Sequence, residues 1–191
     1  MASSPLGFGP YVKGIADDLH RAISTFARMD AVLITAVNGV AAGAGFSLAM
    51  TGDLVLASES ASFTMAYTKA GLSPDGSSSY YLPRLIGVRR TQELMLTNRR
   101  LSAYEASQWG LITEVVADGD LVARTDALAT EMATGARNSG SAVKKLLLTT
   151  FGNGLEEQME IEGRLIAACA DSPDGREGIE SFIAKRAVRF A

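Results

Sequence analysis

Apolar positions follow two different patterns along the chain, one typical of helices and one typical of buried strands. Between residues 11 and 28 the apolar side chains fall three or four positions apart, which predicts an amphipathic helix. Its apolar positions are Val12, Ile15, Leu19, Ile23 and Phe26. Residues 32–37 form an almost continuous apolar run rich in β-branched side chains, which predicts a strand buried on both faces. The chain is therefore expected to combine helices with a buried sheet.

Shorter segments continue this α/β pattern, and a purely helical region follows it. Strand-like runs lie at residues 53–58, 62–65 and 112–116, with helical patterns between and after them. From residue 139 onward only helices are predicted, at about 139–151, 154–171 and 174–187. Apolar positions on these last helices must pack on the α/β core or on another subunit.

A glycine-rich turn follows the first apolar run directly. Gly39, Gly43 and Gly45 interrupt the strand pattern, and residues 46–50 can continue as a helix. Small residues let a ligand approach the main chain, and the first N–H groups of a helix have no intrahelical partner. These groups also carry the positive end of the helix dipole, so we expect the turn to bind an anion or a developing oxyanion.

Two common sequence motifs are similar to this turn. The dinucleotide-binding fingerprint requires Gly or Ala where this chain has Leu48, so that match fails. The nucleophile elbow of serine hydrolases differs only at its last position, Ala49, and would make Ser47 the nucleophile. A serine hydrolase also needs a base, and the only histidine, His20, falls in a helical pattern among charged residues. An ordinary surface histidine is the favoured interpretation of His20.

Composition narrows the class of protein further. The chain has 191 residues, of which 47% are hydrophobic and 20% charged, which is typical of a globular domain. A net charge of −3 gives no general attraction to nucleic acid, and no apolar run reaches the roughly 20 residues that span a membrane. The single cysteine, Cys169, is expected to be a buried small apolar side chain, and a reducing cytoplasm fits best. No cluster has metal-ligand spacing, so no metal is expected.

Several segments in one order and spacing resemble a known family. They are residues 36–50 with Asp53, residues 61–63, 71–76, 82–87, 96–97 and 106–112, and residues 177–186. Over practically its whole length the chain resembles the crotonase family of acyl-coenzyme A (acyl-CoA) enzymes, the enoyl-CoA hydratases and isomerases. The resemblance implies an α/β fold, a crotonase-like spiral of ββα units with a C-terminal all-helical region.

The resemblance also implies two regions and an assembly. Residues 1–135 would form the crotonase-like core and residues 136–191 a helical oligomerisation region, which makes a homotrimer or a dimer of trimers the expected assembly. The chain shows a loop and no strand before its first helix, so the family's N-terminal strands are expected to be missing from the core. One of the family's two oxyanion donors would be missing with them.

The chemistry implied by the resemblance is removal of a proton beside a thioester carbonyl. Two backbone N–H groups stabilise the resulting enolate. One donor corresponds to Ala44, between Gly43 and Gly45. The two glutamates that hydratases use fall on Ser47 and Tyr67, and neither can act as a carboxylate base, so plain hydration is not expected. Coenzyme A enters as part of the substrate, and no separate cofactor is expected.

Asp75 is the predicted base. In family members that shift double bonds, a Pro-Asp at this position moves a proton between carbons, whereas in the family's dehalogenases an aspartate there is the nucleophile. Viewed alone, Pro74-Asp75-Gly76 is more typical of a turn in which aspartate bonds its own backbone. We therefore expect an acyl-CoA isomerase with Asp75 as base. The alternatives are an Asp75-nucleophile dehalogenase or thioesterase, or a catalytically silent CoA-binding protein.

Other candidate binding residues are aromatic or basic. Tyr67, Tyr80 and Tyr81 can line an acyl pocket, although clustered aromatic residues more commonly pack in a core. By the resemblance, Phe182 and Lys185 on the last helix would contact the adenine end of coenzyme A. For Lys185, a solvated helix face is the alternative.

Overall fold

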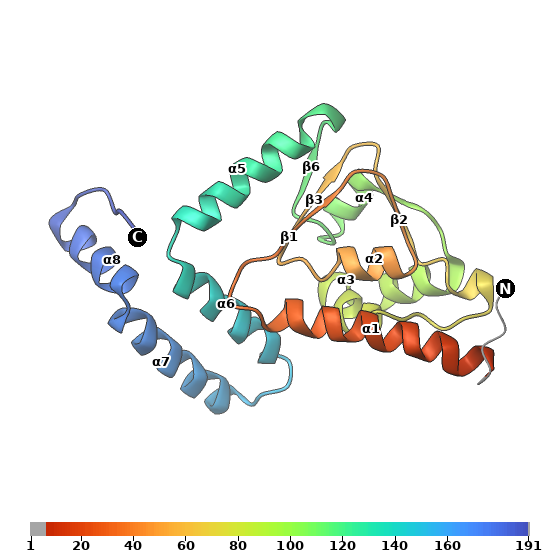
Figure 1. The fold of residues 1–191 in the computed structure, drawn as a ribbon, viewed down its shortest axis with the longest axis horizontal. Helices are drawn as coiled ribbons and strands as arrows, with labels where there is room; N and C mark the ends of the chain where they lie inside the picture. The colour runs from red at the N-terminus through yellow and green to blue at the C-terminus, as the bar shows by residue number, and fades with distance from the viewer. Residues whose placement is uncertain (1–6, 191) are drawn as a thin grey trace. The chain divides into compact units, whose positions relative to one another are not determined.

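Two small sheets form the framework of the part of the chain that carries the predicted site (Figure 1). The computed structural model describes residues 7–190. One sheet is parallel, in the order β1 (Ile34–Val37), β3 (Leu54–Ser58), β6 (Glu114–Val116). In the other, β4 (Ser62–Thr64) lies between β2 (Val40–Ala42), which is parallel to it, and β5 (Leu101–Ser102), which is antiparallel.

Strand β3, and not β1, is the most buried strand of the parallel sheet. Leu56 and Ala57 in β3 are completely buried. In β1 only Val37 is buried and Ala36 is exposed, because among the described residues β1 pairs with β3 alone. The prediction of a first strand buried on both faces was therefore wrong. An apolar run shows that a strand is suited to burial, but the elements that cover it come from elsewhere in the chain.

The core of this region is centred on two phenylalanines. Phe46 of α2 (Ala44–Ala49) and Phe63 of β4 are completely buried, with ring centroids 5.6 Å apart. Helix α3 (Ser78–Thr97) and helix α4 (Ala103–Gln108) contribute further buried apolar side chains. These contacts anchor the short helix α2, and with it the glycine turn that precedes it.

Most predicted helices are present, with small changes at their ends. Helix α1 (Phe8–Arg28) covers the predicted 11–28 segment, and α3 bends at Gly87, where φ is 77°. Short 3₁₀ turns, η1 (Thr68–Ala70) and η2 (Asp118–Asp120), occur between the larger elements.

The described residues form two units by their internal contacts. The first contains residues 7–26 and 33–125, and the second contains residues 27–32 and 126–190. The second unit contains most of α5 (Leu121–Thr134), together with α6 (Arg137–Thr149), α7 (Leu155–Asp171) and α8 (Pro173–Ala184). The all-helical C-terminal region is thus confirmed. The predicted division after residue 135 concerns functional regions, which these contacts do not test, and it stays a prediction.

Two polar contacts fix residues 27–32 to α6 within the second unit. The hydroxyl of Ser141 donates to Asp30 at 2.7 Å, and the buried Lys144 ammonium donates to the carbonyl of Ala31 at 3.1 Å. Cys169 is half-buried, so the expectation that its side chain is fully buried was wrong. Across residues 7–190, no helix combines the length and the apolar character needed to cross a membrane.

The C-terminal segment folds back onto α8 through one carboxylate. Both oxygens of Glu177 accept hydrogen bonds from the Arg186 guanidinium, at 2.7 and 2.8 Å. The backbone N–H of Arg189 and the hydroxyl of Ser181 also donate to Glu177. These hydrogen bonds lower the pKa of Glu177 from 4.5 to about 2, and the bond from Arg186 has the largest effect.

The hydrogen bonds to Glu177 predict that attachment of the C-terminal segment to α8 depends on pH. Because the pKa of Glu177 is lower in the folded chain, the ionised carboxylate stabilises the folded state fully above pH 4.5. This stabilisation is lost as the pH falls towards about 2. At neutral pH, Glu177→Gln should speed amide exchange in residues 185–190, because the charged bonds to Arg186 and Arg189 are lost. Glu162→Gln, at an exposed position of α7, is the control. Equal protection in both variants would show that Glu177 does not hold the segment.

Candidate active site

The predicted glycine turn has a conformation that suits glycine and presents backbone N–H groups to solvent. Gly43 has φ 53° and ψ −123°, and its N–H donates to the carbonyl of Thr64 at 3.1 Å. Its own carbonyl accepts from the Ser47 N–H at 3.0 Å. The N–H groups of Ala44 and Gly45 precede this first helical bond and have no intrahelical partner. Both residues are exposed, so these donors are open to a ligand.

Ser47 holds the turn that carries Asp75. Its side chain is 1% exposed, and its hydroxyl donates to the carbonyl of Asp75 at 2.7 Å. The hydroxyl of Ser78 donates to the same carbonyl at 3.0 Å. A hydroxyl so buried and so bonded is not placed to attack a substrate, which agrees with the sequence argument against a serine hydrolase. Whether Ser47 also contacts substrate, as predicted, remains a prediction.

Gly76 brings the Asp75 turn into direct contact with two helices. It has φ 65°, and a Cβ atom at this position would lie 2.8 Å from Cβ of Ser47 in α2. The same Cβ would lie 3.1 Å from Cδ2 of Leu19 in α1. Positive φ and close approach both exclude a larger side chain at Gly76. The turn is thereby fixed against α1 and α2.

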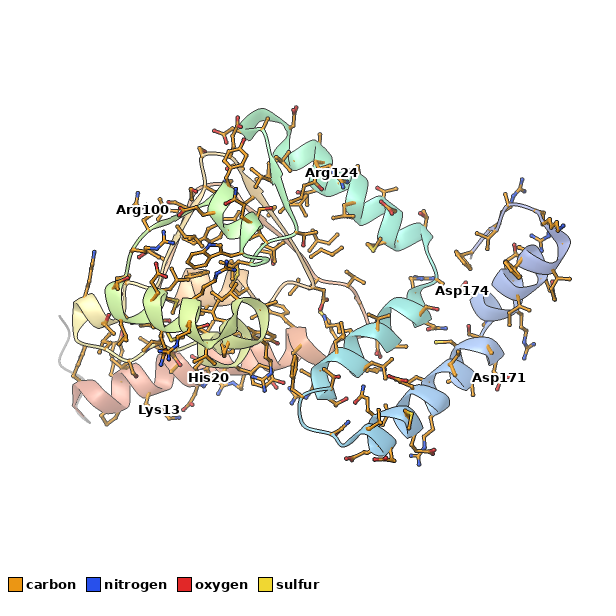
Figure 2. All side chains as sticks on the ribbon, turned by 180° about the vertical axis from the view of Figure 1, so that it is seen from behind. Lys13, His20, Arg100, Arg124, Asp171 and Asp174 are labelled. Carbon is orange, nitrogen blue, oxygen red and sulfur yellow. The ribbon has the colours of Figure 1, made fainter. Side chains whose placement is uncertain are left out.

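His20, which follows Leu19 on α1, contacts the predicted base. Figure 2 labels His20 on helix α1. Nε2 of His20 lies 2.6 Å from Oδ1 of Asp75. The His20 side chain is 48% exposed and that of Asp75 33% exposed. His20 is therefore a surface residue, as the sequence indicates, but it also lies against the predicted base, which the sequence does not show. The 55 positions between the two residues hide the contact, and the only local signal was that His20 directly follows an apolar position of α1.

Tyr67 places a buried phenol beside the same group. A Cβ atom on Gly43 would lie 3.9 Å from Cζ of Tyr67, so the ring lies against the glycine turn. Its hydroxyl is buried and has no partner of hydrogen-bonding geometry among the described residues. Burial raises the pKa of Tyr67, and the charge of Asp75 adds to this effect. At neutral pH Tyr67 is therefore a neutral hydroxyl group.

Six of the eight predicted site residues gather around one turn of the first unit, and two belong to the second unit. The six are Gly43, Ala44, Gly45, Ser47, Tyr67 and Asp75. Phe182 and Lys185 belong to α8 and its C-terminal end in the second unit, where Phe182 is 86% exposed and Lys185 has φ 50°. Their predicted contact with coenzyme A remains a prediction. Within residues 7–190, no three His, Cys, Asp or Glu side chains are grouped so that they could hold a metal ion.

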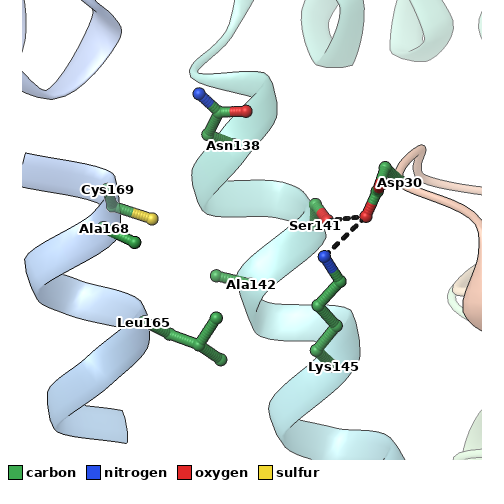
Figure 3. Close-up of a pocket in the computed structure, with 8 residues that line it drawn as sticks. All are labelled: Asp30, Asn138, Ser141, Ala142, Lys145, Leu165, Ala168 and Cys169. Atoms are coloured by element: carbon green, nitrogen blue, oxygen red, sulfur yellow. Dashed lines mark hydrogen bonds and ion pairs between the residues drawn. The ribbon is translucent and has the colours of Figure 1, made fainter. Parts of the chain in front are cut away.

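A separate cavity of about 330 Å³ lies within the second unit (Figure 3). Three of its polar side chains bond one another, because the carboxylate of Asp30 lies 2.7 Å from both the Ser141 hydroxyl and the Lys145 ammonium. Leu165 and Cys169 of α7 line its other side.

Comparison with known proteins identifies the family. A family model described as "Enoyl-CoA hydratase/isomerase" matches residues 13–191. The chain belongs to the enoyl-CoA hydratase/isomerase family. A solved structure of an enoyl-CoA hydratase from Polaromonas sp. JS666 is similar with a TM-score of 0.90 and 33% identity, covering 95% of this chain and 71% of that one. The predicted crotonase-like fold is thereby confirmed.

Three relatives carry names of three different reactions. The chain is 38% identical to the 1,2-epoxyphenylacetyl-CoA isomerase of Escherichia coli (strain K12), over 93% of this chain and 71% of the relative. It is 39% identical to a probable enoyl-CoA hydratase of Rhodobacter capsulatus, over 83% of this chain and 62% of the relative. It is 32% identical to 4-chlorobenzoyl coenzyme A dehalogenase-1 of Arthrobacter sp, over 87% and 60%. The chain thus spans 60–71% of the length of these relatives.

The close contacts of Gly76 predict that alanine is not tolerated there. We expect Gly76→Ala to lower the free energy of unfolding by about 2 kcal/mol or more, from left-handed strain and overpacking against Ser47 and Leu19. Gly45→Ala is the matched control, because a Cβ on Gly45 meets no atom within 4 Å. Its stability should stay within about 1 kcal/mol of the parent. Urea unfolding measures both, and an unchanged Gly76→Ala would contradict the contact.

Proposed function

We propose that this chain is the catalytic part of an acyl-CoA isomerase that shifts a double bond, or isomerises a ring, through an enolate. The observation that carries the proposal is the place of the Asp75 carboxylate. It is fixed on the glycine turn through Ser47 and paired with His20, and it is the one carboxylate among the six gathered residues. A 1,3-shift needs a single base that removes a proton from one carbon and returns a proton to another.

The proposed reaction uses the backbone as well as the carboxylate. Asp75 takes a proton from a carbon next to the unsaturated system, and the electron pair of that C–H bond moves into the enolate. Negative charge develops on the thioester oxygen, where the exposed N–H of Ala44 can donate a hydrogen bond. Return of a proton from Asp75 to the distal carbon completes the shift, with no net gain or loss of atoms.

Hydration suits this group of residues less well. Adding water across a double bond needs groups that activate the water and protonate carbon, and the family positions for these glutamates carry Ser47 and Tyr67. The Ser47 hydroxyl is already bonded to the Asp75 carbonyl, and the raised pKa of Tyr67 disfavours the phenolate that could act as a base. These two residues support an isomerase over a hydratase.

Asp75→Asn tests the proposal directly. The amide keeps the shape of the side chain but cannot accept a proton, so kcat for isomerisation should fall by about 10²-fold or more while CoA affinity changes little. Coupled assays of double-bond migration and calorimetric titration with coenzyme A measure the two quantities. Asp174→Asn, at the first turn of α8, is a control for a change of charge outside the site. Parent-like turnover by Asp75→Asn would leave Asp75 as a turn residue only.

Crotonyl-CoA hydration provides the second test. Each missing acid–base group removes about 10²–10⁴-fold of rate, so we expect hydration to be far slower than double-bond migration in the same preparation. Loss of the crotonyl-CoA absorbance follows hydration, and the two rates are compared at equal enzyme concentration. Hydration as fast as isomerisation would overturn the choice between the two reactions.

One observation favours a second candidate, an Asp75-nucleophile dehalogenase. Here an Asp75 oxygen attacks the carbon that bears a halogen, the new C–O bond forms and halide leaves. His20, at 2.6 Å from the carboxylate, is then near enough to take a proton from the water that cleaves the ester. One turnover of a haloacyl-CoA in heavy-oxygen water would leave heavy oxygen in Asp75 by this route, whereas the isomerase route leaves Asp75 unlabelled.

We further propose that the second unit assembles with other copies of the chain. Large apolar side chains on α7 and α8 are exposed, among them Leu155, Ile166, Phe182 and Ile183. Exposed apolar side chains in such number are typical of association surfaces. A trimer or dimer of trimers, with Phe182 and Lys185 near the adenine of coenzyme A, is the assembly proposed from the family resemblance.

A further inference from the structure

From the contact between α1 and the Asp75 turn, we infer that His20 is a proton relay, which lets the proton held by Asp75 exchange with solvent during turnover. The inference rests on the proposed role of Asp75 as the base. It adds an activity that isomerisation does not require, the exchange of acyl-CoA protons with water. His20 thus acts on the substrate only through Asp75.

The geometry supports direct transfer between the two side chains. The 2.6 Å between Nε2 of His20 and Oδ1 of Asp75 is at the short end of hydrogen-bond distances, as expected for a bond with a charged partner. At this distance one proton lies between the two groups, and the tautomer of His20 determines whether Nε2 donates or accepts it. The pair therefore shares a proton from the start.

The two ends of the pair have different surroundings. The backbone carbonyl of Asp75 accepts hydrogen bonds from the hydroxyls of Ser47 and Ser78. The next residue, Gly76, lies against α1 and α2. His20 lies on the outer helix α1 and nearly half of its side chain is exposed. The imidazole thus joins the reacting carboxylate to bulk water, and imidazole is the side chain that gains and loses protons most readily near neutral pH.

Several charged and titratable side chains lie near the His20–Asp75 pair. Asp17, one turn before His20 on α1, is bonded to Lys13, and Arg21 next to His20 is bonded to Asp18. The charge of His20 acts on Asp17, and the charge of Asp75 acts on Tyr67. Tyr67 stays neutral and Asp17 has its own cation, so His20 is the group best placed to exchange protons with Asp75.

The proton balance of the relay is closed. Asp75 becomes a carboxylic acid when it takes the proton from carbon. Because the exposed imidazole exchanges its ring protons with water, it also presents an unprotonated Nε2, which accepts the proton from Asp75 and becomes imidazolium. The imidazolium releases a proton to water or returns a solvent proton to Asp75, and Asp75 delivers that proton to carbon. Without His20, more of the original protons return to the substrate, because Asp75 is only 33% exposed to water.

The experiment follows deuterium from D₂O into two thioesters by mass spectrometry and proton NMR. One is a β,γ-unsaturated hexenoyl-CoA, which reports isomerisation and exchange together, and the other is hexanoyl-CoA, which reports exchange alone. We expect the parent chain to incorporate deuterium into both. His20→Gln keeps a side-chain N–H donor for Asp75 but cannot carry the proton, so exchange per turnover should fall by about 10²-fold while isomerisation falls much less.

Two further variants separate a relay from a structural role. In His20→Ala, added imidazole should restore exchange, which a residue that only supports the fold would not allow. Arg21→Gln, whose ion pair with Asp18 is exposed, should exchange like the parent. Parent-like exchange in His20→Gln, or no imidazole rescue in His20→Ala, would overturn the relay. Exchange of hexanoyl-CoA without isomerisation would instead overturn the proposed isomerase while leaving the relay standing, and absence of exchange in the parent would overturn the relay.

Discussion

The hydrogen bond from the Ser47 hydroxyl to the Asp75 carbonyl is the contact on which the arrangement of the site depends. It joins α2, which is anchored by the buried Phe46, to a turn that is distant in sequence. The Ser47 hydroxyl also has the Gly43 carbonyl within reach at 3.3 Å, and the shorter bond of 2.7 Å to Asp75 favours one position of the turn. The glycine turn and the carboxylate are therefore held at a fixed separation.

Two glycines, Gly43 and Gly76, shape the two segments that the Ser47–Asp75 hydrogen bond joins. At Gly43 the positive φ opens the start of α2, so that the N–H groups of Ala44 and Gly45 face solvent. At Gly76 the missing Cβ lets the Asp75 turn approach Ser47 and Leu19. Backbone donors and a carboxylate thus come together without any long flexible side chain. This suits catalysis, because preorganised donors need little rearrangement when charge develops.

The partner of the carboxylate determines which reactions the site can support. An aspartate alone can move a proton, whereas an aspartate beside an imidazole can also exchange that proton or have its ester hydrolysed. The relatives named as isomerase and dehalogenase differ in reaction while sharing substantial identity with this chain. A small number of side chains around a common backbone site can therefore decide the chemistry, as is general for folds that host many functions.

The sequence by itself determined the helices, the glycine turn, the position of the candidate base and the family. These features depend on neighbouring residues or on motifs of fixed spacing, which periodicity and resemblance can detect. Tertiary structure decided three things that no local pattern shows. They are the burial of strand β3 rather than β1, the hydrogen bond from Ser47 to the Asp75 turn, and the contact of His20 with Asp75, 55 positions apart. Burial and side-chain pairing depend on which distant segments pack together, and this is set only when the whole chain folds.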